Sequence, residues 1–506
     1  MSPSYPDPAR RLLITFAAMA SATMVAIDIT ICNVALPHMQ SSMQASQDQI
    51  VWVLTSYLIC AAISTPLSSW LANRFGRKRV MVMSIAGFTL TSLLCGVSND
   101  LTMMVAARAL QGFFGASLIP LSQATLLDIN PPERHARAMS VFAMGSMLGP
   151  LIGPTLGGWL TDSFSWRWVF FVNLPFGTLS CALMILFMDE TSHIRQRFDI
   201  FGFFTVSVAL ASFQLMLDRG EQRDWFESTE IQIYAVLTVT ALYLTVVHMF
   251  TARDTFIPPG LFKDRNFAIG CTLGSLVCMV TFATLPVITV MMQTIYDYSA
   301  LRTGLVSAPR GGGTLLAMIM MSRLPPSFDR RILLATGLLM MATAQYTYAG
   351  LDLYADQKAL LIVGLIHGIG AGLIFLPMTM IVFATLSARF RNEGAAFFAL
   401  SRNVGQSLGI SYLQYQLIHN VAASQEHLAE GIRPDNPLMQ LDRPDFSFES
   451  MDALARMSGE IARQANMVGH TNVFSLLAVL SLLMLPLVAF LRTARPAKGE
   501  PLPVME

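Results

Sequence analysis

The sequence predicts an all-α polytopic membrane protein, and three observations lead to that fold class. Of the 506 residues, 54% are hydrophobic and only 13% are charged, about half the charged fraction of soluble domains. The mean hydropathy is +0.53. The apolar runs are continuous and about 20 residues long, which suits helices crossing a ~30 Å hydrocarbon core and not the short alternating strands of a barrel. This composition excludes a cytosolic enzyme, and the net charge of +1 gives no indication of nucleic-acid binding.

The apolar runs predict fourteen transmembrane helices. Their ranges are 11–36, 49–72, 79–98, 101–128, 136–161, 166–188, 199–219, 231–251, 267–292, 301–322, 332–350, 359–386, 395–416 and 471–491. The first run follows Arg10 and Arg11, as in a signal peptide. It is longer than a signal-peptide core and no small-residue cleavage site follows it, so we expect it to remain as a helix.

The distribution of positive charge predicts the orientation in the membrane. The N-terminal side and every second loop contain 21 Lys and Arg residues. The opposite short loops contain five, namely Arg167, Arg219, Arg223, Arg302 and Lys358. Because positively charged loops remain in the cytoplasm, we expect both termini to be cytoplasmic.

The spans group into two halves. Residues 1–190 and 257–492 each contain six spans, residues 191–256 contain two more, and residues 493–506 form a cytoplasmic tail. Two six-helix halves around a central cavity are a transporter architecture. The polar stretch 417–470 is predicted to be an extracytoplasmic loop of the second half. Hydrophobic residues recur at helical spacing within 448–468, and we expect part of this loop to lie along the membrane surface or to contact a partner.

A basic turn follows the second span. Its residues are Leu71, Asn73, Arg74, Gly76, Arg77 and Lys78. Glycine ends a helix, and basic side chains between two membrane helices can bind helix ends and anionic headgroups. A simple positively charged anchor is the alternative interpretation.

The fifth span contains a glycine repeat. Its residues are Gly145, Gly149, Pro150, Gly153, Pro154, Gly157 and Gly158. Glycines spaced four apart share one helix face and admit another backbone closely, and the prolines remove hydrogen bonds and favour a bend. Ordinary small-residue packing is the alternative.

These motifs resemble those of the major facilitator superfamily and, within it, the fourteen-span drug:proton antiporters of the EmrB/QacA type. The segments 28–37, 52–57, 108–112 and 166–170, the last together with Asn173, Pro175 and Gly177, also resemble family signatures. The resemblance covers nearly the whole chain. It implies the major facilitator fold, with 14 transmembrane helices as two six-helix bundles plus two inserted helices. It also implies that 108–112 serves proton coupling and that the glycine repeat belongs to an exporter. The sequence departs from the family at Ser69 and Asn73, where glycine and aspartate are usual.

Few ionisable residues lie well inside the spans: Asp28, Arg108, Arg310 and Arg402. Such residues are costly in a membrane and indicate function. With a rise of about 1.5 Å per residue, Asp28 and Arg108 fall at the same depth. A desolvated carboxylate with a movable arginine partner can bind and release a proton, so we expect this pair to couple proton movement, with a static structural pair as the alternative.

The candidate substrate cavity is predicted from polar and aromatic residues in the spans. These are Asn33, Trp52, Tyr57, Gln111, Gln123, Arg310, His367, Phe375, Asn403 and Gln406. Arg310 could instead cap a helix or snorkel, and His367 could titrate or simply pack between helices. The 32 Met and 32 Phe residues can repack around different apolar guests. The six cysteines form no CxxC pair or Cys/His cluster, so no metal site is predicted.

The favoured function is proton-driven efflux of amphipathic toxic compounds across the bacterial inner membrane by alternating access. No cofactor is expected beyond the proton gradient, because the chain lacks a nucleotide-binding P-loop. Its partners would be small amphipathic substrates, protons and the lipid bilayer. The resemblance also implies a periplasmic adaptor protein and an outer-membrane channel that accept the substrate near 417–470. The alternatives are a dedicated exporter of one endogenous metabolite or siderophore, and a membrane-embedded enzyme or sensor.

Overall fold

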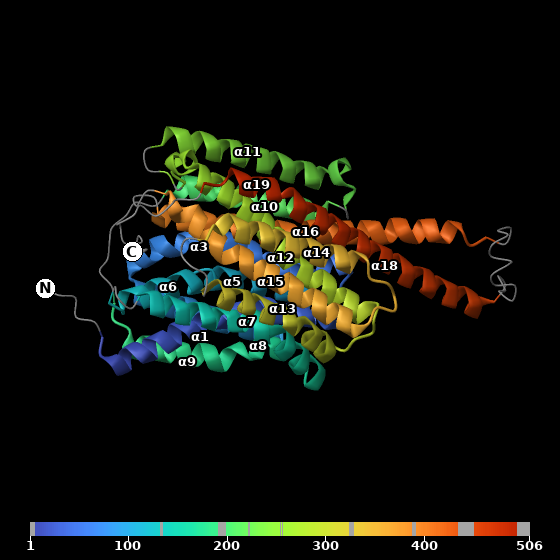
Figure 1. Cartoon of the computed structure of the whole chain (residues 1–506), viewed down its shortest axis with the longest axis horizontal. Coiled ribbons are helices and arrows are strands. Elements are labelled where there is room, and N and C mark those ends of the chain that lie inside the picture. Colours follow the sequence, from blue (N-terminus) through green and yellow to red (C-terminus); the bar gives the residue numbers. More distant parts are fainter. Residues whose placement is uncertain are drawn as a thin grey trace.

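The computed structural model describes residues 6–131, 135–190, 199–220, 223–252, 255, 257–322, 328–386, 391–433 and 450–492. Within these ranges the regular structure is helical and no strand is present, so the predicted all-α fold is confirmed. Long helices run side by side along one axis and form an elongated bundle (Figure 1). The predicted tail 493–506 lies outside the described residues.

The first part of the bundle contains the helices up to residue 187. They are α1 (Pro8–Ser42), α2 (Gln47–Ile50), α3 (Trp52–Phe75), α4 (Arg77–Val97), α5 (Leu101–Gly115), α6 (Leu118–Asp128), α7 (His135–Ser163), α8 (Trp168–Phe171) and α9 (Asn173–Phe187). Helices α5 and α6 together occupy the single predicted span 101–128. The helix is interrupted next to Pro120, which has no N–H to donate to the preceding turn.

Two helices follow at the periphery of the bundle. Helix α10 (Ile200–Arg219) packs against α3, α16 and α11 (Thr229–Thr251), and the short η3 (Trp225–Glu227) connects the pair. Helix α11 is the most exposed of the apolar helices, with 11% of its most apolar window buried. It lies on the outside of the bundle (Figure 1).

The last part of the chain forms the remaining helices. They are η4 (Pro259–Lys263), α12 (Arg265–Thr294), α13 (Ala300–Ser322), α14 (Arg330–Ala349), α15 (Gln357–Ala384), α16 (Arg391–Glu430), α18 (Met451–Leu483) and α19 (Leu485–Phe490). Helices α12 to α18 pack mainly on one another. They meet the first part of the chain chiefly where α13 contacts α7 and α16 contacts α3.

Eleven helical segments in the described ranges are long and apolar enough to cross a membrane. They match eleven of the predicted spans. The other three predicted ranges correspond to α7, α13 and α16, which lie within the bundle (Figure 1). The structure therefore supports a multi-pass helical membrane protein with about eleven candidate spans in the described residues. The predicted count of fourteen stays a prediction.

The predicted loop 417–470 is largely helical where it is described. Helix α16 continues to Glu430 and α18 already begins at Met451, which confirms the predicted helix near 448–468. The two helices project together beyond the bundle along its long axis (Figure 1). The expectation that part of this segment lies along the membrane surface or contacts a partner stays a prediction.

Candidate functional site

A fully buried ion pair connects α1 and α5. Asp28 is 0% exposed and Arg108 is 1% exposed, and Arg108 Nη1 donates to Asp28 Oδ2 at 2.6 Å. The predicted common depth of the two residues is therefore confirmed. Two opposite charges removed from water are stable together only when their remaining hydrogen-bonding groups are also satisfied.

Two amides satisfy the other carboxylate oxygen of Asp28. Gln111 Nε2 donates to Oδ1 at 3.0 Å and Asn173 Nδ2 donates to the same atom at 2.8 Å. Gln111 lies one turn after Arg108 on α5, so both side chains leave the same helix face. Its Oε1 also accepts a hydrogen bond from Arg108 Nη1 at 2.7 Å. Asp28 is therefore held by one cation and two neutral donors.

The arginine is fixed by α3 as well. Arg108 Nε donates to the carbonyl oxygen of Val53 at 2.9 Å, and its guanidinium lies 4.5 Å from the centre of the Tyr57 ring. A Cβ on Gly112 would lie 2.9 Å from the carbonyl carbon of Tyr57. Glycine at this position thus lets α3 and α5 approach closely enough for Arg108 to reach both helices.

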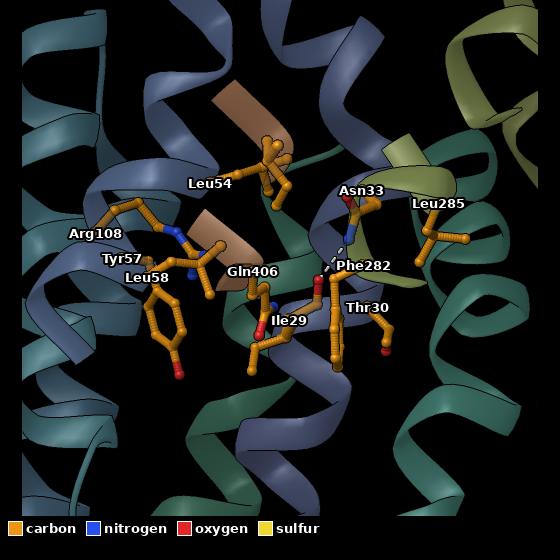
Figure 2. Close-up of a pocket in the computed structure, with 11 residues that line it drawn as sticks. Ile29, Thr30, Asn33, Leu54, Tyr57, Leu58, Arg108, Phe282, Leu285 and Gln406 are labelled. Carbon is orange, nitrogen blue, oxygen red and sulfur yellow. Dashed lines mark hydrogen bonds between the residues drawn. The ribbon is translucent and has the colours of Figure 1, made fainter. Parts of the chain in front are cut away.

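A small cavity lies next to this ion pair. Figure 2 shows Tyr57 and Arg108 on one side and Phe282 and Leu285 on the other, with Gln406 between them. The lining comes from α1, α3 and α5 in the first part of the chain and from α12 and α16 in the second. Its residues are Ile29, Thr30, Asn33, Leu54, Tyr57, Leu58, Arg108, Phe282, Leu285, Gln406 and Ile410. The wall is mostly apolar with a few polar groups, which is typical of a site for amphipathic molecules.

The predicted cavity residues fall into three groups. Asn33, Tyr57 and Gln406 line this cavity, and Asn33 Oδ1 has no hydrogen-bond partner. Gln111 lies in the ion-pair network, whereas Trp52 and Gln123 line neither this cavity nor the second one described below.

The remaining candidates lie on α13, α15 and α16. Asn403 Nδ2 donates to Thr65 Oγ1 at 3.3 Å and so connects α16 to α3. The Phe375 ring lies 5.4 Å from the guanidinium of Arg402. Arg310 lines the second cavity, and His367 is fully buried.

The glycine repeat of α7 packs against α1. A Cβ on Gly149 would lie 2.5 Å from Ala26 Cβ, and one on Gly145 would lie 2.6 Å from Met19 Cε. Gly153 and Gly157 face Thr30 and Ile31 in the same way. The close helix contact predicted for this face is present. The side chain of Pro150 lies outside the described residues.

Gly158 and Pro154 lie at a different contact, between α7 and α13. A Cβ on Gly158 would lie 2.6 Å from the carbonyl carbon of Ala300, and one on Gly304 would lie 2.8 Å from that of Pro154. The two parts of the chain therefore touch through nearly bare backbone here.

The basic turn after α3 is surrounded by carboxylates. Gly76 has φ +93°, a conformation that glycine adopts readily. Glu190 Oε1 accepts a hydrogen bond from the backbone N–H of Lys78 at 3.0 Å, and Arg77 forms an ion pair with Asp128. Leu71 packs against the apolar core.

The Arg74 guanidinium lies 5.4 Å from the Trp70 ring. Asn73 carries no charge, but other residues of the turn have ion-pair partners on α6 and just after α9. This is more than the positively charged anchor of the alternative interpretation.

Two residues of this network were absent from the predicted site residues. Asn173, which binds Asp28, begins α9, and Ser92 on α4 accepts a hydrogen bond from Asn173 Nδ2 at 3.0 Å. Asn173 is 2% exposed and Ser92 is 0% exposed. The sequence signal for Asn173 was its place in the segment that resembles the sixth-helix signature, and nothing in the sequence singled out Ser92.

In the described part of the chain, no three metal-ligating side chains gather at one place, and all six cysteines are free thiols.

Comparison with known proteins agrees with this architecture. The family model described as Major Facilitator Superfamily matches residues 18–410. The chain belongs to the major facilitator superfamily. It is 31% identical to the multidrug export protein EmrB of Haemophilus influenzae over 498 residues, which cover 96% of each chain. It is also 31% identical to the Escherichia coli K12 EmrB over 97% of this chain and 96% of that one.

A third relative is named fatty acid resistance protein FarB, from Neisseria gonorrhoeae. It is 31% identical over 92% of this chain and 93% of the relative. These relatives confirm the resemblance to the EmrB type and place the chain among transporters, not enzymes.

Solved structures show the same fold at low sequence identity. A bacterial homologue of the human lysosomal transporter Spinster, inward-facing and occupied, gives a TM-score of 0.62 at 15% identity, covering 96% of this chain and 97% of that one. A POT family transporter in complex with 5-aminolevulinic acid gives a TM-score of 0.64 at 13% identity, covering 95% and 96%.

Proposed function

We propose that this major facilitator protein exports amphipathic toxic compounds across the bacterial inner membrane in exchange for protons. The observation that carries the proposal is the Asp28–Arg108 pair, because Arg108 lines the cavity between the two parts of the chain while Asp28 lies directly behind it. A proton on Asp28 removes its charge and weakens its bond to Arg108. The arginine then becomes free to rearrange at the cavity wall.

Coupling follows from this competition for Arg108. In the deprotonated state the guanidinium is bound to Asp28, Gln111 and the Val53 carbonyl. In the protonated state the side chain loses its counterion and moves with α5. Movement of α5 relative to α3 changes the cavity wall at Tyr57. Proton binding and substrate binding thus act on the same residues, as an exchange mechanism requires.

Alternating access is supported by the contact between α7 and α13. The two backbones meet closely at Gly158 and Gly304. Asp162 also accepts hydrogen bonds from the backbone N–H groups of Ala300 and Leu301, and separation of the two halves would break these bonds. We place fourteen spans in the membrane, with residues 1–190 and 257–492 as the two rocking halves. The alternation of basic loops supports a cytoplasmic location for both termini.

The projecting helices α16 and α18 suit a partner outside the membrane. On this topology they extend into the periplasm, where they would contact an adaptor protein that leads to an outer-membrane channel. Exposed side chains cover the described end of α16 at residues 425–431, so the segment is suited to water and not to lipid.

The relatives' names favour a multidrug exporter, whereas the name of one relative refers only to resistance to fatty acids. A dedicated exporter of one metabolite or siderophore is the second candidate, because the described cavity is small. A susceptibility panel in a pump-deleted strain, with and without this protein, separates the two. Resistance to several unrelated amphipathic compounds supports multidrug export, and resistance to none supports the second candidate.

The transport mechanism is tested in proteoliposomes that contain the purified chain and an imposed pH gradient. A fluorescent amphipathic cation should be moved while the gradient lasts, and movement should stop when nigericin with potassium collapses it. Movement that ignores the gradient would overturn proton exchange.

A further inference from the structure

A second small cavity lies within the C-terminal part of the chain. It is bounded by α12, α13, α14 and α15. Its lining residues are Leu285, Ile288, Met292, Val306, Ser307, Arg310, Tyr348, Leu360 and Gly364. The wall is therefore apolar apart from a hydroxyl, a phenol and one guanidinium.

Arg310 in this wall has no carboxylate partner among the described residues. One of its terminal nitrogens, Nη2, donates to the carbonyl oxygen of Thr281, whereas Nη1 is buried and unbonded. Arg108 differs sharply, because it has Asp28 at 2.6 Å. A buried cation without a counterion is costly, so Arg310 is maintained in a state that an anion would stabilise.

Two further unsatisfied groups lie near Arg310. His367 is 0% exposed, and neither of its ring nitrogens has a hydrogen-bond partner. The hydroxyl of Ser307, one turn before Arg310, is also buried and unbonded. Buried polar groups are nearly always hydrogen-bonded. Of these groups, the Arg310 guanidinium and the Ser307 hydroxyl line the cavity, so an anion bound there would satisfy both.

Helix contacts bring His367 and Arg310 together. A Cβ on Gly368 would lie 2.7 Å from the carbonyl carbon of Arg310, so α13 and α15 touch at this level. A hydroxyl and a guanidinium are both donors to an anion.

We propose that this cavity binds the carboxylate head group of an amphipathic acid, with Arg310 as its charge partner and Ser307 as an additional donor. Leu285 lines both cavities. The apolar tail of such a substrate therefore extends past Leu285 toward the cavity beside Arg108. The inference rests on the proposed export function and names the substrate class of that transporter.

The test compares two ligands with the same tail and opposite head charge, dodecanoate and dodecyltrimethylammonium. Both are titrated into the purified full chain in nanodiscs at neutral pH without any gradient, and the ligand-induced shift in thermal unfolding is measured. The wild type should bind dodecanoate at least about tenfold more tightly than the cation, since a charge-assisted hydrogen bond contributes on this scale. Equal affinities in the wild type would overturn the proposal without any variant.

Variants locate the effect. Arg310→Gln should weaken dodecanoate binding by about tenfold or more while leaving the cation within about twofold, and Arg310→Lys should retain part of the affinity. Arg302→Gln on the same helix α13 is the matched control, because Arg302 is exposed and interacts with Gln357. An equal loss for both ligands in Arg310→Gln would show a purely structural arginine and overturn the proposal.

The outcome is separable from the proposed function. Gradient-driven movement of an amphipathic cation in proteoliposomes reports export alone. If that movement occurs and dodecanoate binds no better than the cation, the acid site is wrong and export stands. If the gradient moves neither the amphipathic cation nor dodecanoate although dodecanoate binding depends on Arg310, the acid site stands and proton-driven export fails.

Discussion

Thr30 Oγ1 donates a hydrogen bond to the carbonyl oxygen of Gly149 at 3.1 Å. A hydroxyl on α1 is thus seated on the glycine face of α7. A side chain on Gly153 would overlap the same hydroxyl. The repeat of four-residue spacing therefore has a specific physical reason: α1, which holds Asp28, packs backbone-close against the helix that also contacts the C-terminal half.

Leucine on this face should block transport. In Gly149→Leu the new Cβ would lie 2.5 Å from Ala26 Cβ, and such overpacking costs about 1–3 kcal/mol. We expect loss of efflux at near-normal membrane levels, measured by dye export and immunoblotting. Gly312→Leu on α13 is the control, because nothing lies within 4 Å of a Cβ there. Unchanged efflux from a Gly149→Leu, Gly153→Leu double variant would contradict the packing account.

Removal of the amide at Asn173 should destabilise the protein. Asn173→Ala leaves Asp28 Oδ1 with Gln111 as its remaining donor. Loss of a partner for a buried charged acceptor costs about 1–3 kcal/mol, which should appear as a lower unfolding temperature. Ser180→Ala on the same helix is the control, because the buried Ser180 hydroxyl has no partner to lose. Equal unfolding temperatures for the two variants would show that Asn173 does not support the pair.

Part of this site could be predicted from the sequence. Hydropathy locates a span, and helical rise then gives the depth of each charge, so the meeting of Asp28 and Arg108 could be predicted. The sequence did not show which helices lie side by side. Which helices lie next to α1 depends on tertiary packing, so Asn173 and Ser92 were absent from the predicted set although they complete the network.

The continuation of α16 beyond residue 416 was not predicted, for a different reason. A helix in water needs helix-forming residues and not apolar ones, and 417–430 contains Ala, Gln, Glu and Leu, which favour helix. A hydropathy profile does not detect such a helix, so the segment was predicted to be a loop. Only the apolar periodicity near Met451 and Leu454 gave a helical signal, and α18 begins there.

The Gly76→Ala substitution should destabilise the protein although it adds only one methyl group. The residue has φ +93° and a Cβ would overlap the Glu190 carboxylate. Such a conformation costs alanine more than about 1 kcal/mol, and the overlap disturbs the carboxylate that accepts from Lys78. We expect a lower unfolding temperature and slower transport. Gly350→Ala, at the end of α14 with φ −91°, should change neither. A Gly76→Ala protein as stable as Gly350→Ala would refute the argument.

The topology predicts that the end of α16 faces the periplasm. A cysteine in place of the exposed Gln425 should react with an impermeant maleimide added to intact cells whose outer membrane has been permeabilised. Lys263→Cys, exposed at the end of η4 in a predicted cytoplasmic loop, should react only after the inner membrane is opened. Both residues are exposed in the structure. The opposite labelling pattern would reverse the orientation.

A purely structural role for the buried ion pair predicts a different result. If Asp28 and Arg108 served structure alone, each neutral single variant would fold poorly, and neutralising both would restore folding and transport, because no buried charge would remain unpaired. We expect instead that Asp28→Asn, Arg108→Gln folds and binds substrate but does not couple it to protons. Restored gradient-driven transport in the double variant would favour the structural role.

Proton-driven efflux by Asp28→Asn protein in proteoliposomes tests the central claim most directly. The amide keeps the shape of the protonated carboxyl group and removes its titration. The variant should bind substrate and exchange labelled for unlabelled substrate without a gradient, yet show no acceleration when a pH gradient is imposed. Undiminished, gradient-dependent efflux by well-folded Asp28→Asn protein would contradict the claim that this carboxylate couples proton movement to export.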